Sequence, residues 1–344
     1  MYRVGIIGCG KPWRSDGATG FGMSHQHAFG YAASGKAQIV ALADISAENA
    51  RAFADRHGGG DAIYTDYTEM LVKERLDIVS ISTWPHLHAP MVIAAAEAGV
   101  KAIHCEKPMA PTYGESLAME RICRERGVQL TFNHQRRFGA PFRKAKELID
   151  SGAIGELRRM EAACGNLFDW GTHWFDMLFY FNNETPAEWA IGQVDLRGSQ
   201  QVFGAWVEGQ GLSQFQFANG VQGLMTTGHG APDQLWIRVI GSAGQIELDN
   251  AVPLRTWLAG ETGWTTIDTG ENLHGDQCVT RGIIDLIDAL EHGREPELSA
   301  ARVLRTTELI FGTWESARRG GRVDFPLMIV DSPLVTMLTD AGMV

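Results

Sequence analysis

The chain has few cysteines, no long apolar run and no excess of basic residues. Its five cysteines are scattered and include no Cys-x-x-Cys pair, which argues against a disulfide framework and a cysteine-bound zinc ion. No apolar stretch approaches the length of about 18 residues that a transmembrane helix needs. The net charge of −11 disfavours nucleic acids and anionic membranes as partners, because both would be repelled.

Other absences bear on compartment and organisation. No signal-peptide pattern precedes the apolar run at residues 4–7, so we expect a cytoplasmic protein with reduced thiols. The histidines are not grouped with acids or cysteines, and we expect no metal site. There is no internal repeat or low-complexity linker, yet 344 residues exceed what one core usually fills, which predicts two domains.

Residues 1–130 alternate between two hydrophobic periods. Apolar runs typical of buried parallel strands lie at 4–7, 38–43, 77–81, 100–105 and 128–132. Helical patterns lie between them, for example at 46–57, 90–98 and 112–126. This alternation predicts an α/β fold with a doubly wound parallel sheet, the Rossmann arrangement.

Near residue 130 the pattern changes, and we place a second domain over residues 131–344. Helices are predicted at 140–151, 171–181, 278–292 and 299–318, and a strand at 157–164. From about 187 to 268, strand patterns follow one another with no helix between them. Such a run favours an antiparallel sheet.

Gly8-Cys9-Gly10 follows the first strand pattern and predicts a dinucleotide turn. The first glycine permits a tight turn, and the second lets the backbone approach a pyrophosphate at a helix N-terminus. Residues 11–22 then intervene as a solvated loop or a lid, so we place Ser24 where the fingerprint has its third glycine. Asp44 follows 20 residues later, which is the spacing of the acid that binds the adenosine ribose.

The residues around Asp44 favour NAD over NADP. A carboxylate there accepts hydrogen bonds from ribose hydroxyls, whereas a 2′-phosphate would bring a like charge against it. The next residues, Ile45 and Ser46, offer no cation, and we expect Arg51 to form an ordinary surface pair.

Glu106-Lys107-Pro108 ends the strand pattern at 100–105, where a doubly wound domain binds its ligands. Proline fixes its own φ and restricts the residue before it, so the Lys107 side chain has few directions to take. Its ammonium can stabilise a developing alkoxide. The alternative is an ordinary surface lysine in a turn.

Asp169 and His173 are spaced i, i+4 near a predicted helix start, which places them on one face. Histidine titrates near neutral pH and can take the proton of an alcohol that becomes a carbonyl, while a carboxylate fixes its tautomer. The alternative is a helix cap with a core histidine.

Together these motifs resemble the glucose–fructose oxidoreductase/inositol dehydrogenase/rhizopine-catabolism (Gfo/Idh/MocA) family of NAD(P)-dependent oxidoreductases. The similar segments lie at 8–10, 82–89, 98–108, 133–138, 169–176, 293–296 and 320–326. The resemblance implies a Rossmann domain followed by an α/β domain with a large, open, mostly antiparallel sheet. At 165–168 the family's glycine run is reduced, and we expect a differently shaped substrate pocket there.

The resemblance also implies roles for single residues. Lys107 is expected near the nicotinamide and the reacting hydroxyl, with Asp169 and His173 as the acid/base pair. Cofactor contacts are expected from Thr83, Pro85, His88, Glu106 and Lys107, besides Gly8, Gly10, Ser24 and Asp44. Candidate substrate contacts are Trp13, His25, His134, Arg137 and Trp170. For these a surface or core role is the alternative, and Arg136 and Arg137 could meet substrate hydroxyls or a carboxylate.

We therefore expect an NAD-dependent enzyme that transfers hydride between a hydroxyl carbon of a sugar, polyol or cyclitol and the nicotinamide. A second hypothesis keeps NAD but cycles it, so that transient oxidation permits elimination of a glycosidic substituent. A third is a non-catalytic NAD-binding sensor, which the presence of Lys107 and His173 disfavours.

We expect a homodimer or homotetramer built through the C-terminal sheet. The strands between about 187 and 268 alternate apolar and polar residues, and few helices follow to cover both faces. A face exposing Trp206, Phe215, Phe217 and Trp236 would be a large apolar patch for a monomer.

Overall fold

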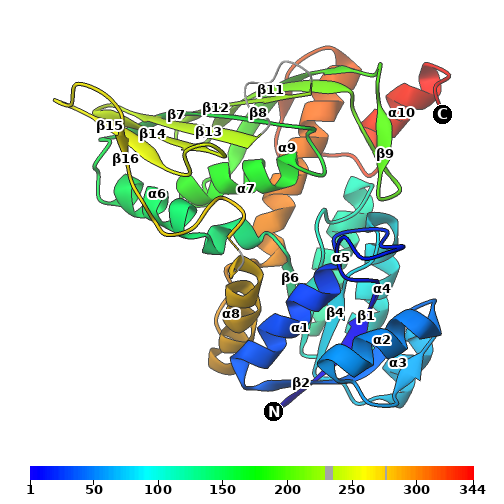
Figure 1. The fold of residues 1–344 in the computed structure, drawn as a ribbon. Coiled ribbons are helices and arrows are strands. Elements are labelled where there is room, and N and C mark those ends of the chain that lie inside the picture. The colour runs from blue at the N-terminus through cyan, green and yellow to red at the C-terminus, as the bar shows by residue number, and fades with distance from the viewer. Residues whose placement is uncertain (229–234, 276) are drawn as a thin grey trace. The chain divides into compact units, whose positions relative to one another are not determined.

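The computed structural model describes residues 1–228, 235–275 and 277–344, which divide into two compact units (Figure 1). Unit 1 comprises Met1–Pro111, Glu115–Gln135 and Val279–Val303. Unit 2 comprises Thr112–Gly114, Arg136–Cys278 and Leu304–Val344. The stretch Val279–Val303 thus groups with the N-terminal part of the chain, whereas the sequence pattern places it in a second domain over 131–344.

Unit 1 is built on a six-stranded parallel sheet with the order β3-β2-β1-β4-β5-β6. Its strands are β1 (Tyr2–Ile7), β2 (Ala37–Ala43), β3 (Ile63–Tyr64), β4 (Ile78–Ile81), β5 (Ala102–Cys105) and β6 (Gln129–Phe132). Its helices are α1 (Met23–Ser34), α2 (Ala47–His57), α3 (Tyr67–Lys73), α4 (Pro85–Glu97) and most of α5 (Tyr113–Arg126) and α8 (Cys278–His292). This strand order is that of dinucleotide-binding folds, so the predicted doubly wound sheet is confirmed.

The core of unit 1 explains why α8 belongs to it. Ile283, Leu286 and Ile287 lie at i, i+3 and i+4 on one side of α8, and all are buried in one cluster with Val4 of β1. Helix α1 approaches α8 so closely that a Cβ on Gly30 would lie 2.7 Å from the Cβ of Ile283. The sequence pattern predicts the amphipathic helix but not the elements against which it packs.

One strand and two helices of unit 1 differ from the predictions. Strand β3 has two residues and helix α3 has seven, too few for a clear hydrophobic period, and neither was predicted. Helix α4 begins at Pro85 rather than at residue 90. Proline is well placed at the first helical position, where the missing N–H needs no partner.

Unit 2 contains a nine-stranded sheet with the order β16-β15-β14-β13-β7-β12-β11-β8-β17. Its strands are β7 (Leu157–Cys164), β8 (Ala187–Asp195), β11 (Gln210–Phe217), β12 (Gln222–Thr227), β13 (Leu235–Gly241), β14 (Gly244–Asp249), β15 (Arg255–Leu258), β16 (Thr265–Thr266) and β17 (Val323–Asp324). A separate pair is formed by β9 (Gln200–Val202) and β10 (Ala205–Val207), and the helices are α6 (Ala140–Asp150), α7 (Gly171–Phe181), most of α9 (Ala300–Arg319) and α10 (Pro333–Asp340). Among the described strands of this sheet only β7 and β12 pair in parallel, so the mostly antiparallel sheet is confirmed.

One face of this sheet lies against α6 and α7 (Figure 1). Along β11, Phe215 and Phe217 point to that face, where their rings lie 5.8 Å from Phe175 and 5.3 Å from Phe179. Both β11 side chains are fully buried, so their predicted place in an exposed patch is wrong. Alternation along a strand separates its two faces but does not tell which face a helix will cover.

The two tryptophans of the predicted apolar patch are not fully exposed. Trp206 lies outside this sheet, in β10 of the separate pair, and is only partly exposed. Trp236 of β13 is also only partly exposed, and its indole N–H donates to Glu247 at 2.8 Å. The large apolar side chains exposed on β8 and β11 are Ile191 and Leu212, at 43% and 39%. Among the described residues, no helix is long and apolar enough to cross a membrane, and no three His, Cys, Asp or Glu side chains form a group that could hold a metal ion.

Candidate active site

Three parallel strands of unit 1 are followed by predicted site residues, and a fourth is followed by Asn133, which was not predicted as one. Gly8 follows β1, Asp44 follows β2, Glu106 follows β5 and Asn133 follows β6. Because these strands are parallel, their carboxyl ends meet at one edge of the sheet, which is where this fold binds nucleotides.

The glycine turn leaves open space beside Gly10 but not beside Gly8. Gly8 has a φ of +85°, and a Cβ there would lie 2.8 Å from the carbonyl oxygen of Ser82. Gly10 has a φ of +57°, and a Cβ there would meet nothing within 4 Å. Both positions favour glycine, and the free space at Gly10 fits the close approach of a pyrophosphate.

Asp44 and Ser24 hold this turn from two sides. Asp44 Oδ2 accepts hydrogen bonds from the backbone N–H groups of Cys9 at 2.8 Å and Gly10 at 3.0 Å, and Oδ1 accepts one from Ser46. The buried Ser24 hydroxyl donates to the carbonyl oxygen of Cys9 at 2.5 Å. Carboxylate oxygens keep further lone pairs for ribose hydroxyls, so these residues fit a dinucleotide.

Glu106 is fixed by a buried polar network. Its Oε1 accepts hydrogen bonds from His27 Nε2 at 2.9 Å and from Asn133 Nδ2 at 2.7 Å, and His27 Nδ1 lies 2.9 Å from the Ser80 hydroxyl. Burial alone would raise the pKa of Glu106, but the contacts with His27, Asn133 and Lys107 hold it below its usual value. An ionised Glu106 therefore lies directly before Lys107, whose peptide bond to Pro108 is cis.

His88 joins the segments that follow β4 and β5. It is fully buried, with Nε2 3.1 Å from the carbonyl oxygen of Thr83 and Nδ1 3.0 and 3.1 Å from those of Pro108 and Met109. Burial lowers its pKa, against the raising effect of these carbonyls. The neutral ring braces the main chain beyond Lys107.

The 11–22 insertion carries an exposed aromatic pair. Trp13 is 54% exposed and lies 5.9 Å from the Phe21 ring, with the Arg14 guanidinium 4.1 Å from the Trp13 ring. His25 instead turns toward α2, where its Nδ1 lies 2.8 Å from His57 Nε2. Burial and then His57 lower the pKa of His25 to about 4. The two predicted substrate residues therefore have different neighbours: Trp13 contacts Phe21 and Arg14, whereas His25 contacts His57.

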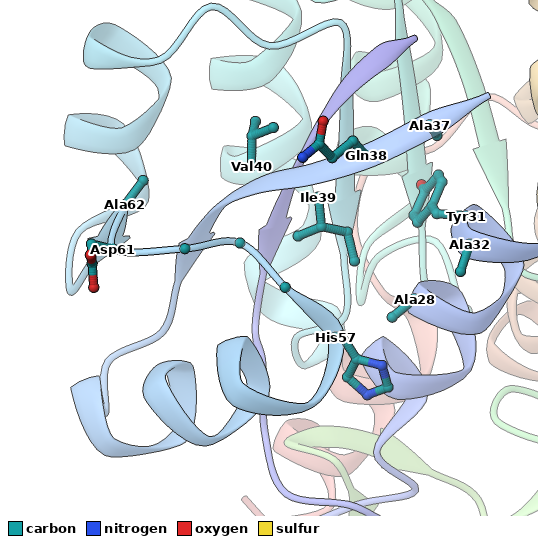
Figure 2. A pocket seen from close by; sticks show the side chains of 13 residues that line it. Ala28, Tyr31, Ala32, Ala37, Gln38, Ile39, Val40, His57, Asp61 and Ala62 are labelled. Carbon is teal, nitrogen blue, oxygen red and sulfur yellow. The ribbon is translucent and has the colours of Figure 1, made fainter. Parts of the chain in front are cut away.

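A hollow of about 560 Å³ lies elsewhere in unit 1 (Figure 2). Its walls come from α1, from Ala37 to Val40 at the start of β2, and from the loop after His57. None of the predicted site residues lines it. It belongs to the amino-terminal half of β2, away from the strand ends that bind nucleotides in this fold.

In unit 2, Asp169 lies two residues before α7 and His173 lies in its first turn, and both are buried. The loop before them is held by Asn166, whose Oδ1 accepts hydrogen bonds from the backbone N–H groups of Phe168 at 3.1 Å and Asp169 at 2.6 Å. The sequence analysis missed this role. Its signal was the known tendency of asparagine to bond the backbone two residues on.

Glu208 holds the same loop from the β10–β11 connection. Its Oε1 accepts hydrogen bonds from the Leu167 N–H at 2.6 Å and the Thr227 hydroxyl at 3.0 Å, and its Oε2 accepts one from the Trp314 indole at 3.3 Å. Burial raises its pKa. A single glutamate between strands gives no signal in the sequence, and this role was also missed.

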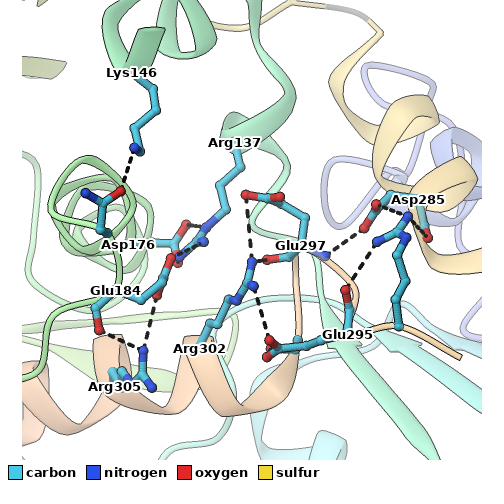
Figure 3. A network of polar contacts seen from close by, with 12 residues as sticks. Arg137, Lys146, Asp176, Glu184, Asp285, Glu295, Glu297, Arg302 and Arg305 are labelled. Carbon is cyan, nitrogen blue, oxygen red and sulfur yellow. Dashed lines mark hydrogen bonds and ion pairs between the residues drawn. The ribbon is translucent and has the colours of Figure 1, made fainter. Parts of the chain in front are cut away.

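The other predicted substrate residues have different settings. Arg137 donates to Asp176 through Nε at 2.8 Å and Nη2 at 2.7 Å, and to Glu184 through Nη1 at 2.5 Å (Figure 3). The carboxylates of Asp176 and Glu184 therefore balance the positive charge of Arg137 without a substrate. Trp170 is partly exposed in unit 2, and His134 is buried in unit 1.

Two family models match the chain. Residues 2–134 match the oxidoreductase family with an NAD-binding Rossmann fold, and residues 164–247 match the GFO/IDH/MocA C-terminal domain. The matched ranges cover the glycine turn, Lys107, Asp169 and His173.

Curated relatives and solved structures agree with the models. D-apiose dehydrogenase of Paraburkholderia graminis is 26% identical over 100% of this chain and 94% of its own length. Inositol 2-dehydrogenase of Azotobacter vinelandii is 31% identical over 47% of this chain and 45% of its own length. A levoglucosan dehydrogenase in complex with NADH and levoglucosan has the same fold, with a TM-score of 0.79 at 23% identity, covering 95% of this chain and 100% of that one.

Proposed function

Because the chain belongs to the Gfo/Idh/MocA family of NAD-binding oxidoreductases, we propose that it transfers hydride between a hydroxyl carbon of a sugar, polyol or cyclitol and NAD. One observation carries the proposal: His27 and Asn133 hold Glu106, directly before Lys107, at the carboxyl end of β5. Relatives named as dehydrogenases of apiose and inositol support the substrate class.

Residues of unit 1 would hold the cofactor. These are Gly8, Gly10, Ser24, Asp44, Thr83, Pro85, His88, Glu106 and Lys107. Asp44 supports a preference for NAD, since a 2′-phosphate would meet its carboxylate. Ile45 is 96% exposed, and the nearby Arg51 pairs with Asp61 at 2.8 Å, so neither supplies a cation for that phosphate.

The chemical roles follow from residue type. The nicotinamide, when bound, accepts or returns the hydride. His173 takes the hydroxyl proton at a ring nitrogen, and Asp169 orients the ring. The Lys107 ammonium stabilises the alkoxide that develops on the same oxygen. Trp13, His134 and Trp170 remain candidates for substrate contacts, whereas His25 and Arg137 have partners within the protein.

The test is NAD⁺ reduction, followed by nicotinamide absorbance, against sugars, polyols, sugar acids, inositols and glycosides. We expect saturable NADH formation with at least one of them. Release of an aglycone without accumulation of NADH would replace net oxidation by oxidation and elimination. Tight NADH binding with no turnover of any compound would contradict catalysis and favour a sensor.

A further inference from the structure

Two adjacent arginines of unit 2 are buried in different ways. They lie in the short 3₁₀ helix Gln135–Phe138, and Arg136 is 4% exposed while Arg137 is fully buried. Arg137 has the carboxylates of Asp176 and Glu184 as partners. Arg136 has no carboxylate partner among the residues that the structure describes.

The contacts of Arg136 leave donors unused. Its Nη1 donates to the carbonyl oxygen of Leu273 at 2.5 Å, and its Nη2 lies 3.2 Å from His274 Nδ1. Its Nε–H is buried without a hydrogen-bond partner in the described parts of the chain. A guanidinium offers five N–H donors, so Arg136 can donate further hydrogen bonds to a ligand from its Nε edge.

Burial of an unpaired cation is unfavourable unless a counter-charge arrives. Burial lowers the pKa of Arg136 to about 10, so the group remains charged at neutral pH. Burial acts on Arg137 as well, but Asp176 and Glu184 raise the pKa of that guanidinium. Among the described residues, Arg137 therefore has carboxylate counter-charges and Arg136 has none.

The unpaired guanidinium lies beside the first turn of α7. Its carbon is 4.7 Å from the Trp174 ring and 6.0 Å from the Trp170 ring. These tryptophans directly follow His173 and Asp169, the proposed acid/base pair. Trp170 is partly exposed and His274 is exposed, so the buried guanidinium of Arg136 has two neighbours that reach solvent.

We propose that Arg136 binds a carboxylate of the substrate, which makes the substrate a sugar acid such as an aldonate or a uronate. This inference rests on the proposed function. A carboxylate can accept two parallel hydrogen bonds from one guanidinium edge. One cation matches one carboxylate, whereas a phosphate brings about −1.5 to −2 charges.

The experiment is calorimetric titration of the NADH-loaded protein with matched ligands: D-gluconate against D-glucitol, D-glucuronate against D-glucose, and D-glucose 6-phosphate. We expect at least one acid to bind at least about 10-fold more tightly than its neutral partner, since a charged hydrogen bond has that strength. Arg136→Met should remove this preference while changing neutral binding less than about 3-fold, and Arg136→Lys should keep part of it.

Arg143→Met is the matched control, because Arg143 is exposed on α6 with its guanidinium 4.7 Å from the Phe138 ring. It removes the same charge and should leave the preference intact. Equal binding of acids and neutral partners, no binding of any acid, tighter binding of the phosphate, or equal weakening of both ligand classes in Arg136→Met would overturn the proposal.

The binding experiment tests the anion site, and the turnover experiment tests the proposed function, so either proposal can be contradicted alone. If no compound reduces NAD⁺ but acid binding depends on Arg136, the anion site stands and the proposed function falls. If neutral sugars are oxidised and acids do not bind, the reverse holds. Should thermal unfolding show that Arg136→Met does not fold, the wild-type pairs and Arg136→Lys decide the question.

Discussion

At the scale of single residues, the proposed acid/base pair makes a separable prediction. His173→Ala should lower kcat by at least about 10²-fold, the usual contribution of a positioned acid or base. NADH affinity should stay within about 3-fold, because the glycine turn and Asp44 lie in unit 1. Lys107→Ala should lower kcat to a similar extent.

Steady-state kinetics and NADH fluorescence titration would measure both effects. His292→Ala, which changes an exposed histidine at the end of α8, is the control and should behave as wild type. Turnover of His173→Ala within a few-fold of wild type would show that His173 is not the acid/base group.

We propose that the carboxylate of Asp44 sets the choice between NAD and NADP. We expect kcat/KM to favour NAD over NADP by about 10²-fold or more, because a 2′-phosphate would place like charges in contact. Asp44→Ser with Ile45→Arg should narrow or invert this ratio. Asp44 also accepts hydrogen bonds from the N–H groups of Cys9 and Gly10. The variant Asp44→Asn is therefore needed to separate the effect of the charge on cofactor choice from the effect of a changed turn geometry. Equal use of both cofactors by the unmodified protein would place Asp44 away from the ribose.

At the scale of elements, the close contact between α1 and α8 leads us to expect that Gly30→Ala destabilises the protein, although helix propensity alone favours alanine. Gly30→Ala should gain about 1 kcal/mol from propensity alone. A Cβ there would meet the Cβ of Ile283 at 2.7 Å, and overpacking typically costs about 1–3 kcal/mol. We expect net destabilisation in urea unfolding. The exposed Ala33→Gly measures the propensity effect in the same helix, and a more stable Gly30→Ala would refute the close contact.

Glu208 predicts a pH dependence of stability. Burial raises the folded-state pKa of Glu208 above the usual 4.5. The protonated carboxyl therefore contributes its full stability below about pH 4.5, and this contribution is lost as the pH rises through the folded-state pKa. Glu208→Gln cannot ionise and should lose less unfolding free energy than wild type between about pH 5 and about pH 8. The exposed Glu188→Gln is the control. Parallel pH profiles for Glu208→Gln and wild type would contradict the assignment.

The predictable elements are those with long and regular hydrophobic periods. The sequence pattern places β7 at 157–164 and α7 at 171–181, and both bounds agree with the structure. The short β3 and α3 carry too few residues for a period. Motifs single out Lys107 and Asp169 as candidate site residues, whereas Asn166 and Glu208 act through contacts that exist only after the loop before α7 has formed.

At the scale of the whole molecule, we propose a homodimer or homotetramer formed through the outer face of the nine-stranded sheet. Ile191 and Leu212 lie on paired strands and are 43% and 39% exposed. Light scattering at micromolar concentration should give at least twice the mass of one chain. Ile191→Lys with Leu212→Lys should weaken association, whereas Ile45→Lys in unit 1 should not. A monomeric mass for the unmodified protein would rule out this assembly.

The place of α8 in unit 1 has a consequence for synthesis on the ribosome. A nascent chain emerges from its N-terminus, and an N-terminal domain usually folds before the next one is made. Here Ile283, Leu286 and Ile287 complete the cluster around Val4, so the first unit stays unfinished until the whole nine-stranded sheet except β17 has been translated. A nascent chain stalled at residue 135 therefore still has part of its hydrophobic core open to chaperones.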